Sequence, residues 1–576
     1  MSDGLVEELT TDVLVIGGGG AGTYAALRAG DCNPTLDITL VVKGFVAQSG
    51  CTRMVQGGYN AVLDPADSFE LHFGDTLKGG GFINNQELAW VLVTEAPERI
   101  RELENRFGCF FDRHPDGRIH QKPFAGQSFD RTVHRGDLTG IEIMQRLKDQ
   151  VFSRPNLRRL EEHRALDLLL SPDGQRVVGA VVLDMRRGTF AVVRARATVV
   201  ATGGGATMYR IAAPSLEKAG DGAAMLYRAG VLMMDMEMMQ FHPTGLLAGR
   251  SRLTGSVLEE GLRGAGGHLR NALGERYMER YDAQRMERST RDVVARASYM
   301  EIQAGRGTAN GGVWLDVSHL GAELVEQKFP GMVERCRGVG FDLAREPVEI
   351  SPTAHFHMGG ARIDAACRTS LAGLLVAGED ASGVHGANRL GGNGVAESIV
   401  FGARAGAAAA TACAEAGQGA CDPAFVRAVV QRTTALLGRD AGEDAYALRE
   451  ELGALTWDHF GLVRSADGLQ KGLAQLADLR ERAERISVHG GPRFNLEWQQ
   501  ALDVRNLVEL ARLVAEAAVA RTESRGSHYR NDHPETDNAR WLCNVLLRRH
   551  GDRPRLWTEP VLLTRMSPFA AAAGRG

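Results

Sequence analysis

Histidine and arginine side chains stand beside glycine turns at several places in the middle of the chain. The segments that carry them are FHPTG at 241–245, EEGLRG at 259–264, TRDVVAR at 290–296, PTAHFHMGG at 352–360 and HGANRLGGN at 385–393. Solvated surface charge would explain any one of these side chains. Buried guanidinium and imidazole groups need acceptors, however, and a small dicarboxylate would supply them. The pattern therefore predicts a site for a small dianion.

A glycine-rich turn near the N-terminus predicts where a nucleotide would bind. The apolar run at 12–16 enters GGGGAG at 17–22, and residues 23–29 have helical composition. Gly17, Gly19 and Gly22 have the spacing G-x-G-x-x-G, in which glycines let the backbone touch a pyrophosphate and the helix N-terminus stabilises its charge. The next strand, at 38–42, ends in Lys43, where a nicotinamide-binding fold usually has an acid for the ribose.

Two later strands also run into glycines. ATVVAT at 197–202 is followed by three glycines, and GLLVAGE at 373–379 ends in a glycine and Glu379. A glycine turn without a ligand is the alternative for each strand alone. Three such strand ends, far apart in sequence, predict one dinucleotide-binding domain assembled from distant segments, with bound FAD. The Leu/Ala/Glu/Arg-rich stretch from about 422 to 515 predicts a helical bundle.

The composition excludes several classes of protein. Lys+Arg is 67 and Asp+Glu is 71 in 576 residues, and the net charge of −4 argues against a nucleic-acid-binding protein. The 70 glycines suit a close-fitting cofactor cradle. The eight cysteines include no C-x-x-C pair, so neither an iron–sulfur cluster nor a zinc ribbon is expected. The acidic N-terminus and the lack of long apolar runs predict a large cytoplasmic α/β protein without a spanning segment.

The order of these segments resembles the flavoprotein subunit of succinate dehydrogenase and fumarate reductase, and its relative L-aspartate oxidase. The resemblance runs from the glycine turn to RTESRGSH at 521–528, nearly the whole chain. It implies a discontinuous Rossmann-like FAD-binding domain, an inserted α+β capping domain and a C-terminal helical domain. We expect the boundaries 1–240 and 351–420 for the FAD-binding domain, 241–350 for the capping domain, 421–515 for the helical domain and 516–576 for a C-terminal region.

The family also implies a reaction. Hydride passes between the flavin and a carbon of a four-carbon dicarboxylate, and a proton moves at the neighbouring carbon. By resemblance, His242, His355 and Arg389 bind the substrate carboxylates, and Arg291 exchanges the proton. An arginine, with a pKa above about 12, is a poor acid unless a relay restores its proton. Glu260 and Arg263, three residues apart, match the family's relay.

The positions that the resemblance assigns to FAD are spread over the first 400 residues. They are Gly17, Gly19 and Gly22 at the pyrophosphate, Lys43 near the adenosine ribose, Ser49, Thr52, Gln56, Gly57 and Gly58 around the isoalloxazine ring, and Asp221, Glu379, Asn393 and Val395. The Met-rich run at 233–239 is expected to fill the core near the cofactor.

One departure from the family concerns the attachment of the flavin. The histidine that links the flavin in the family aligns with Cys51, so no histidyl bond can form. A noncovalent FAD is therefore expected, with Cys51 beside it; a cysteinyl thioether and an inert buried thiol are the alternatives. Loss of the link is expected to lower the flavin potential, which favours fumarate reduction or oxygen-linked oxidation. L-aspartate oxidases also hold FAD noncovalently.

A second departure lies in the substrate site. The family usually has Thr or Ser before the relay glutamate, and this chain has Glu259. A carboxylate that faces a dianion is repulsive unless it is protonated or turned away. Three explanations stay open. Glu259 is neutral and donates a hydrogen bond, or it points elsewhere while Thr254 or Ser256 substitutes, or it binds the ammonium group of an amino dicarboxylate.

Two further segments, FAGQSFDRT at 124–132 and NDHPETDNARW at 531–541, resemble the respiratory enzymes more than the oxidase. We therefore expect interconversion of succinate and fumarate, with oxidation of L-aspartate to iminosuccinate as the alternative. A flavin-binding subunit without enzymatic activity would leave the His/Arg constellation idle. Because this chain has no cluster ligands, the resemblance implies an iron–sulfur partner subunit, with or without a membrane anchor. The chain would then lie in the cytoplasm or peripherally on the cytoplasmic face of the membrane.

Overall fold

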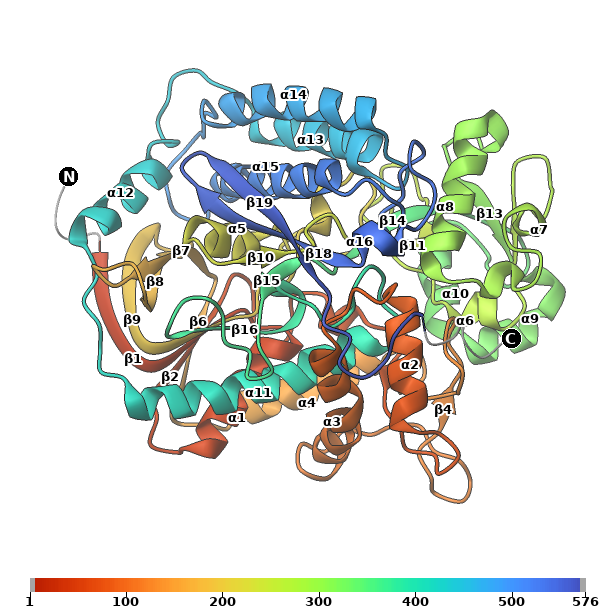
Figure 1. The fold of residues 1–576 in the computed structure, drawn as a ribbon, viewed down its shortest axis with the longest axis horizontal. Coiled ribbons are helices and arrows are strands. Elements are labelled where there is room, and N and C mark those ends of the chain that lie inside the picture. Colours follow the sequence, from red (N-terminus) through yellow and green to blue (C-terminus); the bar gives the residue numbers. More distant parts are fainter. Residues whose placement is uncertain (1–5, 570–576) are drawn as a thin grey trace.

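A seven-stranded sheet forms the centre of the largest part of the molecule (Figure 1). The computed structural model describes residues 6–569. The strands lie in the order β6–β2–β1–β9–β8–β7, and β16 also pairs with β9. The pairs β6–β2, β2–β1, β1–β9 and β9–β16 are parallel, and β7–β8 and β8–β9 are antiparallel. The bounds are β1 Val6–Ile16, β2 Ile38–Val42, β6 Leu157–Glu161, β7 His163–Leu170, β8 Val177–Asp184, β9 Thr189–Val200 and β16 Leu374–Val376.

Two helices that pack closely together cover one face of this sheet. Helix α1 (Gly20–Cys32) follows β1, and α11 (Asn393–Glu415) runs beside it from far along the sequence (Figure 1). A Cβ atom on Gly402 would lie 2.6 Å from the carbonyl oxygen of Ala21, and one on Gly406 would lie 2.3 Å from that of Ala25. The two backbones therefore touch, which fixes the glycine turn and the start of α11 relative to each other.

A three-stranded sheet and four further helices complete this part of the molecule. Helix α3 is 20 residues long in total, although it contains Pro97. The elements are β3 Tyr59–Asn60, β4 Gln121–Lys122 and β5 Thr132–Val133, which form a three-stranded sheet, and the helices α2 Phe69–Gly79, α3 Gln86–Asn105, α4 Thr139–Phe152 and α5 Asp221–Arg228.

The chain between about 240 and 357 forms a four-stranded antiparallel sheet with its own core (green in Figure 1). Its strand order is β11–β14–β13–β12. The core of this part contains buried residues from Leu246 to Ile350 and is separate from the main core. The elements are β11 Met239–Leu246, β12 His268–Arg270, β13 Val313–Asp316, β14 Val348–His357, α6 Gly261–Gly264, α7 Met278–Tyr281, α8 Arg291–Glu301, α9 Ala322–Lys328 and α10 Pro330–Arg337.

Four long helices follow α11, and each begins with a capped N-terminus. The side chains of Asp422, Asp444, Ser465 and Asn495 accept hydrogen bonds from first-turn amides, which stabilises a helix by about 1 kcal/mol. The helices are α12 Pro423–Thr434, α13 Ala445–Phe460, α14 Ala466–Ala483 and α15 Leu496–Ala520. Figure 1 shows α13, α14 and α15 stacked along one side of the molecule.

The C-terminal hairpin adjoins a buried ion network around Arg521, whose Nη2 donates to the carbonyl oxygen of Cys543 at 2.9 Å. Strands β18 (Cys543–His550) and β19 (Arg553–Pro560) complete a five-stranded sheet with β10 (Met233–Met234), β15 (Gly360–Arg362) and β17 (Ala381–Ser382). Arg521, the residue that follows α15 (Leu496–Ala520), is fully buried. Its Nε lies 2.6 Å from Glu237 Oε1 and its Nη1 lies 2.9 Å from Glu523 Oε1.

These elements confirm the predicted fold class. A Rossmann-like sheet is assembled from distant segments, an α+β part is inserted in it, and helices follow toward the C-terminus. The Met-rich run is buried as expected, with Met233, Met236 and Met239 in the main core. Across residues 6–569, no helix combines the length and the apolar character that crossing a bilayer requires. The expected tail at 570–576 lies outside the described residues.

Replacement of Arg521 by Met is expected to destabilise the protein by about 3–5 kcal/mol, because Glu237 becomes a buried carboxylate without its cation. Urea denaturation measures this free energy of unfolding. Arg540→Met is the matched control, because that side chain is 84% exposed and lies 3.7 Å from Asp537. Equal free energies of unfolding for the two variants would contradict a stabilising contribution from the Arg521 network.

Candidate active site

One cavity of about 620 Å³ joins the glycine turn to the predicted substrate residues. It lies at the carboxyl ends of β1, β2, β9 and β16, where ligands of open α/β sheets bind. Predicted residues that line it are Gly17, Gly19, Lys43, Ser49, Cys51, Thr52, Gln56, Gly57, Gly58, Asp221, Glu379, Val395, His242, Glu259, Glu260, Arg291, His355 and Arg389. Gly22, Arg263 and Asn393 lie behind this lining.

The glycine turn has no room for a side chain at its first and last positions, Gly17 and Gly22. Gly17 has φ +118, and a Cβ there would lie 2.1 Å from the carbonyl oxygen of Ala201. A Cβ on Gly22 would lie 1.9 Å from the carbonyl oxygen of Gly17. Helix α1 begins here, and its first amide, that of Gly20, donates to Thr52 Oγ1 at 3.1 Å. Residues 17–21 line the cavity, so the positive end of the helix adjoins it. This turn fits the pyrophosphate of FAD.

Beyond the glycine turn, two cations and two carboxylates form ion pairs at the edge of the cavity. Lys43 Nζ lies 3.1 Å from Asp221 Oδ2 and 2.6 Å from Asp503 Oδ1, and Arg164 Nη1 lies 2.9 Å from Asp503 Oδ1. Burial alone would raise the pKa of Asp221, but the charges of Arg164 and Lys43 lower it. Asp503 belongs to α15, so the helical part of the chain contributes to this end of the cavity.

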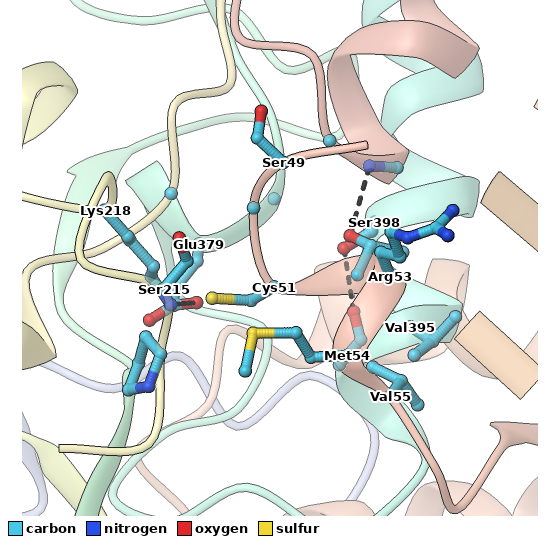
Figure 2. Close-up of a pocket in the computed structure, with 18 of the residues that line it drawn as sticks. Ser49, Cys51, Arg53, Met54, Val55, Ser215, Lys218, Glu379, Val395 and Ser398 are labelled. Atoms are coloured by element: carbon cyan, nitrogen blue, oxygen red, sulfur yellow. Dashed lines mark hydrogen bonds and ion pairs between the residues drawn. The ribbon is translucent and has the colours of Figure 1, made fainter. Parts of the chain in front are cut away.

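Cys51 faces a buried ion pair (Figure 2). Lys218 Nζ pairs with Glu379 Oε2, and both side chains line the cavity. Figure 2 shows the Cys51 side chain directed toward Ser215 and Lys218. Burial raises the pKa of the Cys51 thiol, with a smaller opposing effect from Lys218. The thiol is therefore neutral at neutral pH and a poor nucleophile.

A row of three charged groups lies at the substrate end. Arg291 is the first residue of α8, and its Nε and Nη2 lie 2.8 and 2.7 Å from Glu260 Oε2. Arg263 Nη2 lies 3.6 Å from Glu260 Oε1. Burial alone would raise the pKa of Glu260, but the charges of Arg291 and Arg263 lower it. Glu260 is therefore ionised between two guanidinium groups.

The carboxylate-binding candidates surround this row. The rings of His242 and His355 are 5.4 Å apart, and burial with the nearby arginines lowers the pKa of both well below the usual value. Burial, and then the charge of Arg291, lowers the pKa of Arg389 to about 9. Within residues 6–569, Nδ1 of His355 and Nε of Arg389 are buried without a hydrogen-bond partner. A dianion would satisfy such groups.

Gln240 holds two of the three arginines of the site in place, and no sequence pattern pointed to it. Its Oε1 accepts hydrogen bonds from Arg291 Nη1 at 3.3 Å and from Arg389 Nη2 at 3.1 Å. Its Nε2 donates to Asn388 Oδ1 at 2.6 Å. Gln240 lies two residues before His242 on β11, a proximity that alone does not indicate a function.

Glu259 is turned toward a lysine from another part of the chain. It is 3% exposed, and its Oε1 pairs with Nζ of Lys122 at the end of β4. Burial raises the pKa of Glu259, and Lys122 opposes this effect. Of the residues expected as substitutes, Ser256 lines the cavity, whereas Thr254 Oγ1 donates to the carbonyl oxygen of Gly249.

Charged residues that escaped the sequence analysis include Arg164 and Lys218, which line the cavity, and Lys122, which lies beside it. Each is brought to the site by tertiary packing, and none belongs to a recognisable local motif. The one available signal was Lys218, three residues before Asp221 in a segment assigned to FAD. The residues predicted from the sequence lie at or beside the cavity, and their individual roles stay predictions.

Two family models match the chain. A FAD binding domain matches residues 12–395, and the C-terminal region of fumarate reductase flavoproteins matches residues 449–573. Together they span most of the chain, including the cavity described above.

Similar proteins are named as fumarate reductases. The chain is 43% identical to a component of the fumarate reductase (CoM/CoB) of Methanothermobacter marburgensis, over 93% of this chain and 97% of that protein. It is 35% identical to the fumarate reductase flavoprotein subunit of Escherichia coli, over 99% and 97%. A solved structure of a variant of the E. coli quinol fumarate reductase FrdA matches with a TM-score of 0.92 at 35% identity, over 98% of both chains.

Gly17→Ala is expected to yield a folded protein with little or no FAD, because the added methyl group collides with the backbone at the end of β9. The ratio of flavin to protein absorbance after purification measures the FAD content. Gly417→Ala is the control, since a Cβ at that position meets no atom within 4 Å. A normal flavin content in Gly17→Ala would contradict the assignment of the turn to the pyrophosphate.

Proposed function

The chain belongs to the succinate dehydrogenase and fumarate reductase family of flavoproteins, and we propose which of its residues carries out each part of the reaction. It is an FAD-dependent oxidoreductase that interconverts succinate and fumarate. When bound, FAD would supply the hydride in fumarate reduction and accept it in succinate oxidation. The observation that carries the proposal is the Arg291–Glu260–Arg263 row, buried beside two imidazoles and Arg389 in the same cavity as the glycine turn.

The substrate carboxylates are bound by His242, His355 and Arg389. The two imidazoles are neutral and donate hydrogen bonds, while Arg389 supplies a charge-assisted, fork-shaped contact. Gln240 keeps Arg389 and Arg291 at fixed separation through one shared oxygen. This arrangement orients the double bond of fumarate, and orientation alone removes much of the barrier for a bimolecular step.

Arg291 transfers the proton. In fumarate reduction an N–H proton of Arg291 goes to the carbon next to the one that receives hydride. The ionised Glu260 takes a proton from Arg263 and passes it to Nε or Nη2 of Arg291. Arg263 Nη1 donates to the carbonyl oxygen of Glu287, whose carboxylate pairs with the partly exposed Arg276. The backbone contact orients Arg263 but carries no proton, so Arg263 regains its proton from water.

L-aspartate oxidation is disfavoured by the same geometry. An amino dicarboxylate needs an acceptor for its ammonium group, and Glu259 was the candidate for this role. The carboxylate of Glu259 is already paired with Lys122. An ammonium group in the pocket would therefore meet the cationic groups of the site without a free carboxylate.

The electrons reach the flavin through a partner protein. The chain has eight cysteines without a C-x-x-C pair and hence no iron–sulfur ligand set of its own. The similar solved chain is named as part of a quinol fumarate reductase, and another relative as one component of a fumarate reductase (CoM/CoB). We infer an iron–sulfur partner subunit, which would attach this chain peripherally to a membrane if a quinol is the donor.

Dithionite-reduced holoprotein is expected to regain its oxidised flavin absorption rapidly when mixed with fumarate under anaerobic conditions. L-aspartate is expected not to bleach the oxidised protein. In Arg291→Ala, reoxidation by fumarate should slow by about 10²–10⁴-fold, the usual contribution of a general acid. Stopped-flow absorption of the flavin band measures all three.

Arg288→Ala is the control for this experiment, since Arg288 lies on the exposed surface three residues away. Reoxidation of Arg291→Ala at a rate near that of the unmodified protein, with normal flavin content, would refute the proton role. Bleaching by L-aspartate would move the protein to the oxidase class.

The flavin is expected to be noncovalent, because the raised pKa of the Cys51 thiol keeps it neutral. After acid precipitation, all yellow colour should appear in the supernatant, and Cys51→Ala should behave identically. Colour that stays with the precipitate and disappears in Cys51→Ala would instead establish a thioether.

A further inference from the structure

The pair formed by Lys122 and Glu259 is a feature for which the reaction itself gives no reason. The two residues lie 137 positions apart in sequence. Lys122 comes from the three-stranded sheet next to the main sheet, and Glu259 comes from the inserted part, immediately before the relay residue Glu260. Their side chains are 17% and 3% exposed, so water screens the interaction weakly.

We propose that Lys122 is a positioning residue for substrate binding: its ammonium group holds the ionised Glu259 carboxylate aside and cancels its charge, so that the pocket accepts a dianionic dicarboxylate. This proposal rests on the proposed function and deepens it. It assigns to Lys122 control over the charge class of the substrate, and it explains why an acidic residue is tolerated in an anion site.

The contacts of Lys122 support an anchored ammonium group. Besides Glu259, Nζ lies 3.4 Å from the carbonyl oxygen of Gly136 and 5.9 Å from the centre of the Phe124 ring. Phe124 lines the cavity, whereas Lys122 does not. The ammonium group therefore lies behind the cavity wall and draws Glu259 toward that wall.

The charge balance shows what Lys122 adds. Glu259 and Glu260 are adjacent buried carboxylates, and Glu260 is balanced by Arg291 and Arg263. Glu259 has Lys122 as its ion-pair partner. Without Lys122, a buried carboxylate would remain beside the dianion. Like charges brought together at a binding site cost several kcal/mol in binding free energy.

The surroundings of the pair contain both signs of charge. Glu259 faces Lys122, Asp137 and Glu260, and the two carboxylates raise its pKa further after the effect of burial. On the other side, Lys122 adjoins His134 and His120, and burial followed by the charge of Lys122 lowers the pKa of His134 to about 4. Both imidazoles are therefore neutral near neutral pH, and Lys122 is the cation that acts on Glu259.

The experiment compares Lys122→Met, Lys122→Arg, Glu259→Gln and the double variant Lys122→Met/Glu259→Gln. Fumarate reduction by each holoprotein is followed with a reduced viologen dye across a series of pH values. Lys122→Met should raise KM for fumarate about tenfold or more, with kcat nearly unchanged. The increase in KM should be complete above the pKa that Glu259 has in this variant, which is higher than in the unmodified protein because Lys122 no longer lowers it. It should disappear as the pH falls through that pKa, because the carboxyl then becomes neutral.

Two variants should restore binding. Lys122→Arg keeps the charge, and the double variant removes both charges, so each should have a KM close to that of the unmodified protein. Glu259→Gln alone frees the ammonium group and should lower KM. Lys471→Met is the matched control, since it removes a lysine–carboxylate pair that is 64% and 77% exposed.

Several results would overturn the proposal. They are an unchanged KM in Lys122→Met, a rise that is equal at every pH, and a double variant no better than the single one. If Lys122→Met loses its FAD, an unchanged KM in Glu259→Gln is decisive against the proposal. Binding of fumarate, measured from the change in the flavin spectrum of the oxidised protein, gives the same comparison without turnover. Tight binding without turnover in the unmodified protein would refute only the proposed function.

Discussion

A buried excess of positive charge at one end of the cavity is the constraint on which the rest of the structure depends. Arg263, Arg291 and Arg389 are each less than a tenth exposed, and Glu260 is the carboxylate that contacts two of them. Cations removed from water are costly unless opposite charge balances them. The scaffold must hold these groups together before the substrate arrives, and the dianion then completes the balance. The neutral histidines fit this account, because further cations would increase the cost.

The scaffold meets this demand by converging three separate parts of the chain. Arg291 stands at the N-terminus of α8, an unfavourable place for a cation, and its double contact with Glu260 offsets the effect of the helix dipole. Arg389 lies in the segment before α11, which packs backbone to backbone on α1. The register of β11 against β14 shifts on both sides of His242, and such irregularities re-aim side chains beside active sites.

The sequence predicted the parts of the site whose chemistry is local. The glycine spacing at 17–22 specifies a turn by itself, and the strand-to-glycine ends correctly predicted a sheet of distant segments. The His/Arg segments indicated a dianion site because each combines charge with a tight turn. Lys122, Arg164 and Gln240 could not be found in this way, because their partners are determined by tertiary packing. Glu259 illustrates the limit: its residue type was an evident anomaly, but its direction depends on a lysine 137 positions away.

The discontinuous sheet has a consequence for the synthesis of the chain. The last residues of β9, at 198–200, pair with β16 at 374–376, and about 170 residues separate these strands. At about 5–20 residues per second, this edge of β9 stays unpaired for roughly 10 to 35 seconds on the ribosome. The inserted part emerges during this interval, attached to a sheet with an open edge, which is a template for wrong strand pairing. The arrangement that brings distant residues to one active site thus also makes the nascent chain dependent on protection until Val376 has been added.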